Sequence, residues 1–319
     1  MRKILVTGAL GQIGSELTMA LRSTYGDNHV IASSKTRDEN VKVIDGGPFE
    51  IVDVTNAQQI ADAVKKYKVD TIVHLAAILS AVGEANPALA WDVNINGLVS
   101  VLEVARELNC SVFTPSSIAV FGPSTPKDFT PQDTIQRPTT MYGVTKVAGE
   151  LMCDYYYQKF GVDTRGVRFP GLISYETLPG GGTTDYAVHI YYEALKKGKY
   201  TCYIDKDTKM DMMYMPDALR AITDLLEADP AKLKHRNAFN VTAMSFNPEE
   251  IYMEIKKHVP GFMMVYDVDP VRQGIAASWP NSLDDSDARE EWGWKPSYDL
   301  SSMTADMLEK LRIKLDNQK

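Results

Sequence analysis

Cysteine and histidine are scarce in this sequence, and neither occurs in a pattern typical of a metal site. The three cysteines, Cys110, Cys153 and Cys202, are odd in number, widely spaced and include no C-x-x-C pair. The five histidines show no ligand spacing. We therefore expect a reducing compartment and no metal site.

Basic charge and long apolar runs are also lacking. The chain has 34 Lys and Arg against 42 Asp and Glu, a net charge of −8, which argues against nucleic acid or an anionic membrane as the main partner. No apolar run reaches the ~18 residues needed to span a membrane; residues 71–83 come nearest and include His74. The first strand begins almost at the N-terminus, so we expect no signal peptide and a cytoplasmic protein. A mitochondrial matrix protein is the alternative, if a longer precursor carries a transit peptide.

The stretch from Val6 to Gly14 follows a short apolar strand and leads into a helical pattern. Its glycines have the spacing G-x-x-G-x-x-G. In a dinucleotide-binding fold the first permits a tight turn, the second lets backbone approach a pyrophosphate, and the third lets the helix pack close to the sheet. The alternative is an ordinary glycine turn, but the position between strand and helix favours dinucleotide binding at the helix N-terminus. The residues assigned to the cofactor here are Gly8, Gly11, Gln12, Ile13 and Gly14.

Strand and helix patterns alternate through the first half of the chain. The apolar runs are typical of buried parallel strands, which we expect over 3–6, 29–32, 49–54, 71–77, 111–114 and 164–169. This predicts an α/β fold with a Rossmann-type doubly wound parallel sheet in residues 1–170, to which residues from about 210 to 245 return. Residues 171–319 are expected to form mainly a smaller, mixed α/β substrate-binding part.

The end of the second strand carries Ser33-Ser34, followed by Lys35 and Arg37. A dinucleotide fold that prefers NAD usually has Asp or Glu at this point. Ser34 can bond a ribose hydroxyl but repels no 2′-phosphate, so we expect NAD as the cofactor with only modest discrimination against NADP. Asp53 either meets the adenine or marks the start of the next helix. Further cofactor contacts are assigned to Ser34, Asp53, Val54, Leu75, Ala76, Ala77, Tyr142, Lys146 and Phe169.

Tyr142 and Lys146 are four residues apart, so on a helix they lie on one face. An ammonium near a phenol favours its ionised form. The pattern is common by itself, but here it follows the glycine motif and Ser116-Ser117 at the end of the fifth strand. A catalytic pair is therefore the favoured interpretation. Asn94 lies in a helix expected over 88–108; as a mediocre helix former it either makes a local backbone bond or serves the site.

The segment 178–185 reads Leu-Pro-Gly-Gly-Gly-Thr-Thr-Asp. One interpretation is a linker that caps the next helix. The other is a loop whose backbone N–H groups close over a small anionic ligand.

Together these residues resemble the extended short-chain dehydrogenase/reductase superfamily over essentially the whole chain. Within it, residues 115–122, 178–187 and 278–280 are similar to the L-threonine 3-dehydrogenases of the UDP-galactose-epimerase-like branch. The resemblance implies NAD-dependent oxidation of L-threonine at C3 to 2-amino-3-oxobutanoate by a homodimer.

The resemblance also implies roles for individual residues. Tyr142 would be the general base with its pKa lowered by Lys146, Ser117 rather than Ser116 would bond the reacting oxygen, and Asn94 would hold a water that returns the proton to solvent. The substrate would be surrounded by Ser80, Ser117, Tyr142, Gly182, Thr183, Thr184 and Trp279.

Two other functions stay open from the sequence. A nucleotide-sugar epimerase or dehydratase would need cations for a diphosphate, and Arg168 and Arg272 are candidates. A catalytically inactive dinucleotide-binding regulator could dispense with the serine, tyrosine and lysine, but this chain has all three.

Overall fold

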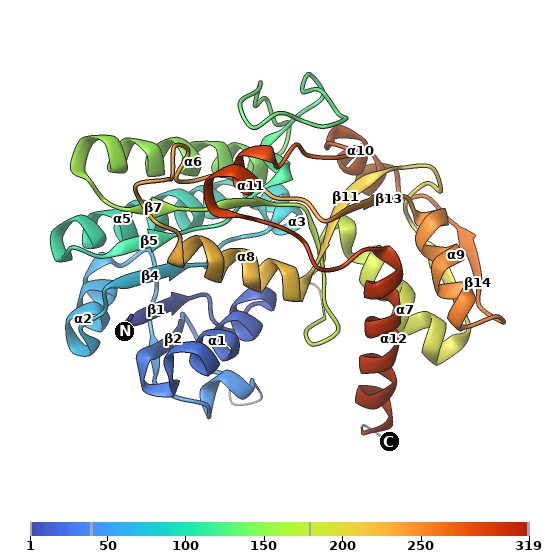
Figure 1. Ribbon diagram of the computed structural model, residues 1–319, viewed down its shortest axis with the longest axis horizontal. Helices are drawn as coiled ribbons and strands as arrows, with labels where there is room; N and C mark the ends of the chain where they lie inside the picture. The colour runs from blue at the N-terminus through green and yellow to red at the C-terminus, as the bar shows by residue number, and fades with distance from the viewer. Residues whose placement is uncertain (1, 39–40, 179, 318–319) are drawn as a thin grey trace.

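A parallel sheet of six strands forms the centre of the computed structural model, which describes residues 2–38, 41–178 and 180–317 (Figure 1). The strand order is β3-β2-β1-β4-β5-β7. It reverses between β1 and β4, where an open sheet of this kind leaves a crevice at the carboxyl ends of its strands. The predicted Rossmann-type fold is confirmed. The strands are β1 (Ile4–Thr7), β2 (Val30–Ser34), β3 (Phe49–Ile51), β4 (Thr71–His74), β5 (Ser111–Phe113) and β7 (Thr164–Arg165).

Helices cover both faces of this sheet because its strands alternate apolar side chains between two cores. Ile4 and Val6 pack in one core with α1 (Gln12–Tyr25) and α8 (Met215–Glu227). Leu5 packs in the other with α2 (Ala57–Tyr67), α5 (Gly97–Leu108) and α6 (Met141–Phe160). Figure 1 shows the two layers, with α5 and α6 above the sheet and α1 and α8 below it. Helix α8 comes from the second half of the chain, within the residues expected to return to the nucleotide-binding part.

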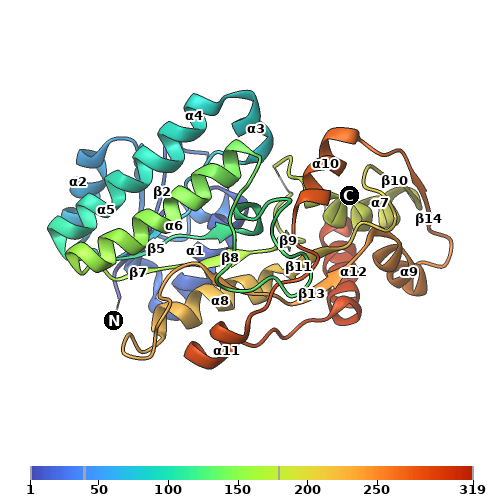
Figure 2. The same cartoon turned by 90° about the horizontal axis from the view of Figure 1, so that it is seen from above.

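Most of the remaining elements lie beyond the carboxyl edge of the sheet, whereas α4 continues toward α5 and α11 lies beside α8 (Figure 2). They include three small sheets: β13-β11-β9, β12-β8-β6 and β10-β14. The strands are β6 (Ser116–Ser117), β8 (Val167–Phe169), β9 (Gly171–Ile173), β10 (Lys199–Cys202), β11 (Met210–Tyr214), β12 (Phe239–Asn240), β13 (Met244–Phe246) and β14 (Met263–Tyr266). The helices are α3 (Ser80–Ala85), α4 (Pro87–Trp91), α7 (Tyr186–Lys197), α9 (Pro248–His258), α10 (Pro270–Ser278), α11 (Ser286–Trp292) and α12 (Leu300–Asp316).

Two expected elements are interrupted. The sixth strand, expected over 164–169, divides at Gly166 into β7, which stays in the main sheet, and β8, which pairs with β6 and β12. The helix expected over 88–108 is divided by a π-helical turn, Asp92–Asn96, between α4 and α5. Both interruptions lie next to predicted site residues, since β6 carries Ser117 and the π-helical turn carries Asn94.

The stretch Pro87–Leu108 is long and apolar enough to span a membrane by length and composition alone. Half of it is buried inside the protein, as in a core helix of a soluble protein, so it is weak evidence for a membrane span. Leu98, Val101 and Leu102 pack against the main sheet.

The last helix holds the segment that follows β9. Lys314 donates hydrogen bonds from Nζ to the carbonyl oxygens of Tyr175 (2.8 Å) and Glu176 (2.6 Å). The next residue, Thr177, contacts the first helix: its hydroxyl lies 3.3 Å from that of Ser15, and its carbonyl accepts from Gln12. The first and last helices therefore meet through residues 175–177.

Candidate active site

The glycine turn joins β1 to α1 with almost no room for side chains. Gly8 has a φ of 70°, and a Cβ there would lie 2.7 Å from the backbone nitrogen of Ala76. A Cβ on Gly14 would lie 2.2 Å from the carbonyl oxygen of Gly8. Gly11 is the N-cap of α1, so Gln12 and Ile13 begin the helix with N–H groups that have no acceptor within it. This cradle of backbone N–H groups fits a pyrophosphate.

Asp53, which follows β3, has a partner that the sequence did not predict. Helix α2 is capped by Asn56, whose side chain accepts from Gln58 and Gln59, so Asp53 does not mark the start of that helix. Its carboxylate instead pairs with Lys35 at 2.8 Å. Ser34 ends β2 beside it, and Val54 is buried in contact with Gly97 of α5.

The end of β4 lies next to the glycine turn, and the end of β8 lies next to Ser117. Leu75 and Ala76 pass directly beside Gly8, with Ala77 following. Ser80 is the first residue of α3 and is buried. Phe169 pairs in register with Ser117, but its side chain packs in the core below the sheet, so its main chain is the part that can meet a cofactor.

Helix α6 brings Tyr142 and Lys146 to the same edge. Thr140 caps the helix, which fixes Tyr142 in its first turn. Lys146 Nζ lies 5.5 Å from the centre of the Tyr142 ring and donates to the carbonyl of Pro115 at 2.7 Å. The two residues share one helix face, as predicted from their spacing.

The two adjacent serines have different partners. The Ser116 hydroxyl donates to the buried carboxylate of Glu150. The Ser117 hydroxyl lies near enough to Tyr142 to lower the pKa of its phenol, and it accepts from the N–H of Ala119. Ser117 therefore faces the predicted base and Ser116 does not.

The electrostatics around Tyr142 differ from the expectation. Burial raises the pKa of Tyr142 to about 12, and the Ser117 bond opposes this only in part. Burial also lowers the pKa of Lys146 to about 8, against the charge of Glu150, which raises it. Because Lys146 lies over the ring and bonds Pro115, it does not lower the pKa of the phenol in this arrangement.

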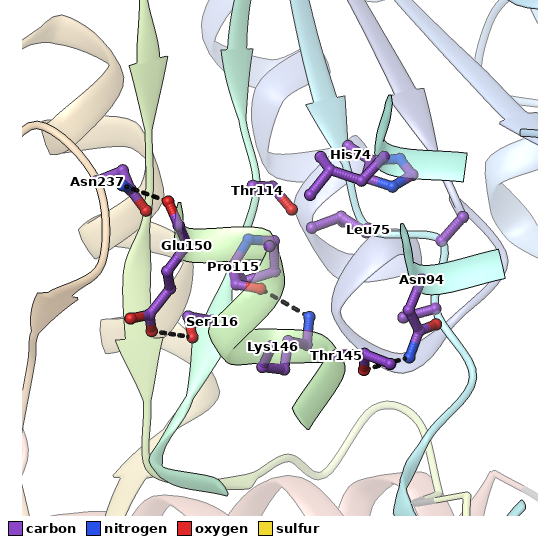
Figure 3. Close-up of a pocket in the computed structure, with 14 residues that line it drawn as sticks. His74, Leu75, Asn94, Thr114, Pro115, Ser116, Thr145, Lys146, Glu150 and Asn237 are labelled. Atoms are coloured by element: carbon purple, nitrogen blue, oxygen red, sulfur yellow. Dashed lines mark hydrogen bonds between the residues drawn. The ribbon is translucent and has the colours of Figure 1, made fainter. Parts of the chain in front are cut away.

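Asn94 bonds with residues that lie far from it in the sequence. Its amide oxygen accepts from the N–H of Ile78 (2.7 Å), and its amide nitrogen donates to the carbonyl of Ile78 and the hydroxyl of Thr145. Of the two interpretations that the sequence left open for Asn94, the local backbone bond is therefore wrong. A cavity of about 30 Å³ lies between Asn94, Lys146 and Glu150, as Figure 3 shows. That is room for about two waters, at roughly 10–15 Å³ each.

The loop after β9 closes on itself. One carboxylate oxygen of Asp185 accepts from the N–H of Gly181 (2.8 Å) and of Gly182 (2.6 Å). The expectation that these backbone N–H groups close over an anionic ligand is therefore wrong for Gly181 and Gly182. Pro179 lies outside the described residues. Thr183 is buried and Thr184 half-buried in the turn that leads into α7.

Trp279 connects the C-terminal part to Tyr142 at the start of α6. It ends α10 and is buried in a cluster with Ile118, Val120 and Phe121, against which Tyr142 also packs. Arg168, by contrast, is not available to a diphosphate. Its guanidinium is buried and paired with Glu150 at 2.8 Å, and it also donates to Gln132 and Asn240.

Sequence reasoning missed Glu150 and His74. Glu150 lies four residues after Lys146, so the i, i+4 series from Tyr142 could have revealed it. His74 is buried, and its Nδ1 lies 2.8 Å from the Thr7 hydroxyl. Burial, with the nearby charge of Lys146, lowers the pKa of His74 to about 3, which keeps it neutral.

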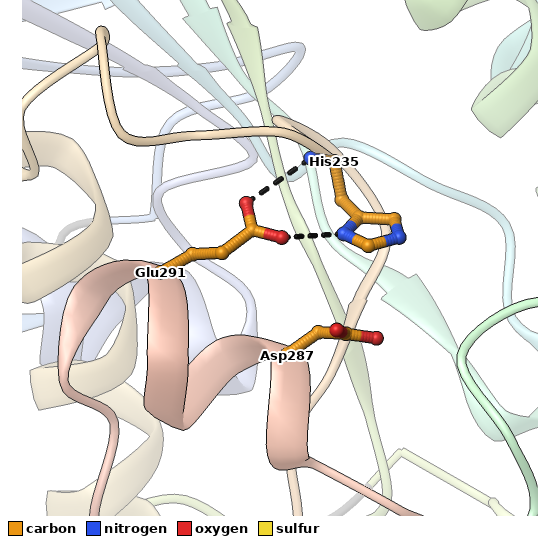
Figure 4. A group of neighbouring side chains, drawn as sticks. All are labelled: His235, Asp287 and Glu291. Atoms are coloured by element: carbon orange, nitrogen blue, oxygen red, sulfur yellow. Dashed lines mark hydrogen bonds and ion pairs between the residues drawn. The ribbon is translucent and has the colours of Figure 1, made fainter.

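One group among the described residues has atoms close enough to hold a metal: His235, Asp287 and Glu291 (Figure 4). Glu291 already accepts from His235 Nδ1 (2.6 Å) and from the backbone N–H groups of Lys234 and His235. The group therefore fastens α11 to the segment before β12 without an ion.

The sequence model of the NAD dependent epimerase/dehydratase family matches residues 4–242. The chain belongs to this family. Its resemblance to the extended short-chain dehydrogenase/reductases is thereby confirmed, and the family supports an oxidoreductase function.

Individual family members match the whole chain. An uncharacterised epimerase/dehydratase of Staphylococcus haemolyticus is 58% identical over 318 residues, 100% of each chain. The L-threonine dehydrogenase of Clostridium difficile is 66% identical, covers 98% of each chain and has a TM-score of 0.97. A monomeric L-threonine 3-dehydrogenase from a metagenome is 48% identical over 98% of this chain and 99% of its own, with a TM-score of 0.93.

Proposed function

We propose that this protein oxidises L-threonine at C3 to 2-amino-3-oxobutanoate with NAD. The observation that carries the proposal is the 66% identity, over 98% of both chains, to an enzyme that acts on L-threonine. The position of Ser117 next to Tyr142, where it lowers the pKa of the phenol, supports it. NAD, when bound, supplies the hydride acceptor.

The chain's own residues bind and orient the reactants. The N–H groups of the turn from Gly8 to Gly14 hold the pyrophosphate. Ser117 holds the 3-hydroxyl oxygen and Tyr142 takes its proton. Because burial raises the pKa of Tyr142 to about 12, the phenolate needs positive charge nearby. Lys146 would supply it only if its ammonium left the carbonyl of Pro115, and the oxidised nicotinamide of bound NAD would add to it. The cavity beside Asn94 and Lys146 gives room for water that passes the proton on.

The substrate contacts come from the C-terminal part. Thr183 and Thr184 supply hydroxyls, Ser80 closes the opposite side, and Trp279 packs against the cluster that holds Tyr142. We propose residues 1–170 with about 210–245 as the nucleotide-binding part and the rest of 171–319 as the substrate part. Shared packing of α8 with α1 supports this division.

A nucleotide-sugar epimerase or dehydratase is the second candidate, because the curated relative carries that description. It is less favoured because Arg168 is sequestered by Glu150 and Arg272 lies over the ring of Tyr203, 4.3 Å from its centre.

One assay separates the candidates. With NAD, the purified protein should form NADH from L-threonine but not from D-threonine. The Tyr142→Phe variant should form no NADH with either substrate. Conversion of UDP-glucose without threonine turnover would support the epimerase. If the protein binds NADH but catalyses neither reaction, the inactive dinucleotide-binding regulator is the function that remains.

We also propose a homodimer in the cytoplasm. Helix α6 exposes Val144, Leu151 and Tyr155 on one face, and the adjoining α4 exposes Leu89 and Trp91. The bacterial relatives and the buried, unpaired cysteines support the compartment.

A further inference from the structure

The ends of β2 and β3 place a cation and an anion side by side. Ser34 pairs in register with Ile51, and the N–H of Val52 donates to the carbonyl of Ser34 at 2.9 Å. The residues that follow, Lys35 and Asp53, consequently lie next to each other, with 2.8 Å between Nζ and Oδ2.

The anion of this pair is fixed and the cation is not. Asp53 Oδ1 accepts from the N–H of Thr55 (3.1 Å) and from its hydroxyl (2.8 Å). The Asp53 side chain is 27% exposed, whereas that of Lys35 is 73% exposed. The hydrogen bond and charge of each partner raise the pKa of Lys35 and lower that of Asp53. Asp53 therefore determines where Lys35 lies.

The position matters because the end of the second strand is where a dinucleotide-binding fold meets the adenosine ribose. NADP carries a phosphate on that ribose and NAD does not. Ser34 is uncharged, so the charge met by a 2′-phosphate comes from the residues just beyond it. Lys35, directly after Ser34, is the ammonium best placed to reach the phosphate if it leaves Asp53.

We propose that Asp53 sets the choice of cofactor by holding Lys35, so that a lysine that would attract NADP is neutralised and turned toward β3. The inference rests on the proposed function, since it requires a bound dinucleotide. Asp53, just after β3, would then provide the discrimination against NADP that an acidic residue at the end of β2 provides in other dinucleotide-binding folds.

The test compares four proteins: the parent, Asp53→Asn, Lys35→Met and the double variant. NADH and NADPH are titrated separately by nicotinamide fluorescence, and the ratio of Kd for NADPH to Kd for NADH is taken for each. The amide introduced by Asp53→Asn keeps an oxygen for the Thr55 bonds. The ratio, unlike either Kd, is insensitive to an adenine contact that Asp53 makes with both cofactors.

In Asp53→Asn the ratio should fall by about three- to tenfold, as for one lysine–phosphate contact at the surface. Lys35→Met should change the ratio less than twofold in the parent and reverse the fall in the Asp53→Asn background. The fall should shrink in 1 M salt, where the screening length is about 3 Å. Glu50→Gln is the matched control: it removes one negative charge from the same strand, but one paired with Lys66, and should leave the ratio unchanged.

Two results would overturn the inference. An unchanged ratio in Asp53→Asn means that the carboxylate has no part in the choice. An equal effect of Lys35→Met in both backgrounds means that the charges act independently and Lys35 is not held. If the parent binds neither NADH nor NADPH, the proposed function itself fails.

Discussion

Two neighbouring serines illustrate how a single position decides chemistry. Ser116 and Ser117 follow one another in a strand, so their side chains point to opposite faces. Ser116 meets Glu150 in the interior, whereas Ser117 meets Tyr142. The sequence alone could not separate them, because both partners lie on α6, and the choice depends on which serine lies next to the first turn of that helix.

Variants of these residues should separate catalysis from binding. Tyr142→Phe keeps the ring but removes the proposed base, so kcat should fall by about 10²–10⁴-fold with an unchanged Kd for NADH. Ser117→Ala should lower kcat as well. Ser116→Ala is the matched control: it removes a bond to a buried carboxylate, so it should lower the free energy of unfolding by about 1–3 kcal/mol and spare kcat. Steady-state kinetics with urea denaturation measures both effects, and equal losses of kcat in the two serine variants would contradict the assignment.

His74 should make the protein sensitive to acid. Its folded pKa is about 3, while an unfolded histidine titrates near 6.5. The unfolded state therefore takes up the proton first, and the free energy of unfolding should fall from pH 6.5 downward by up to about 1.4 kcal/mol per pH unit. Urea denaturation at several pH values should show a shallower acid loss in His74→Gln than in the parent.

His235 provides the control of opposite sign. Burial lowers its pKa, but the hydrogen bond and charge of Glu291 outweigh this and raise it. Its contribution is present below pH 6.5 and is lost as the pH rises through the folded pKa. His235→Gln should therefore lower the free energy of unfolding more at pH 5 than at pH 8. If the loss of stability changes with pH in the same direction in both histidine variants, the argument is refuted.

At the scale of elements, local patterns predicted the order of strands and helices but not their interruptions. Apolar runs and the glycine turn predicted β1, β4 and α1 because those features depend on neighbouring residues. The π-helical turn at Asn94 depends on Ile78 and Thr145, 16 and 51 residues away in sequence. The break between β7 and β8 likewise depends on pairing with β12, from far along the chain. The parts of the candidate site that rest on short sequence motifs were predicted. Glu150 and His74 were missed because their hydrogen-bond partners lie far from them in the sequence.

The loop between β9 and α7 should depend on Asp185. Asp185→Ala leaves two backbone N–H groups without their carboxylate, a loss of about 1.5–3 kcal/mol for bonds to a charged group. With Thr183 and Thr184 no longer held, KM for L-threonine should rise while the Kd for NADH stays constant. Asp299→Ala, which removes the cap of α12, should leave KM unchanged. A parent-like KM in Asp185→Ala would mean that the turn is held by other contacts.

At the scale of the whole molecule, the apolar face of α6 requires a partner if the protein is a dimer. Leu151 is 62% exposed and Tyr155 is 50% exposed. The double change Leu151→Glu and Tyr155→Glu should convert the dimer to a monomer, because it places charges in an apolar interface. Ile313→Glu, at an exposed apolar residue of α12, is the matched control. Sedimentation velocity of all three proteins decides this, and a monomeric parent would contradict the proposal.

The contact between the first and last helices through residues 175–177 has a consequence for synthesis on the ribosome. The chain emerges at about 5–20 residues per second, so the turn from Gly8 to Gly14 is complete many seconds before Lys314 leaves the exit tunnel. Until then the carbonyls of Tyr175 and Glu176 lack the ammonium that holds them, and Trp279 has only just been made. The proposed nucleotide-binding part is thus synthesised before the proposed substrate part can be completed, and the order of translation is the order in which the two proposed parts of the site are finished.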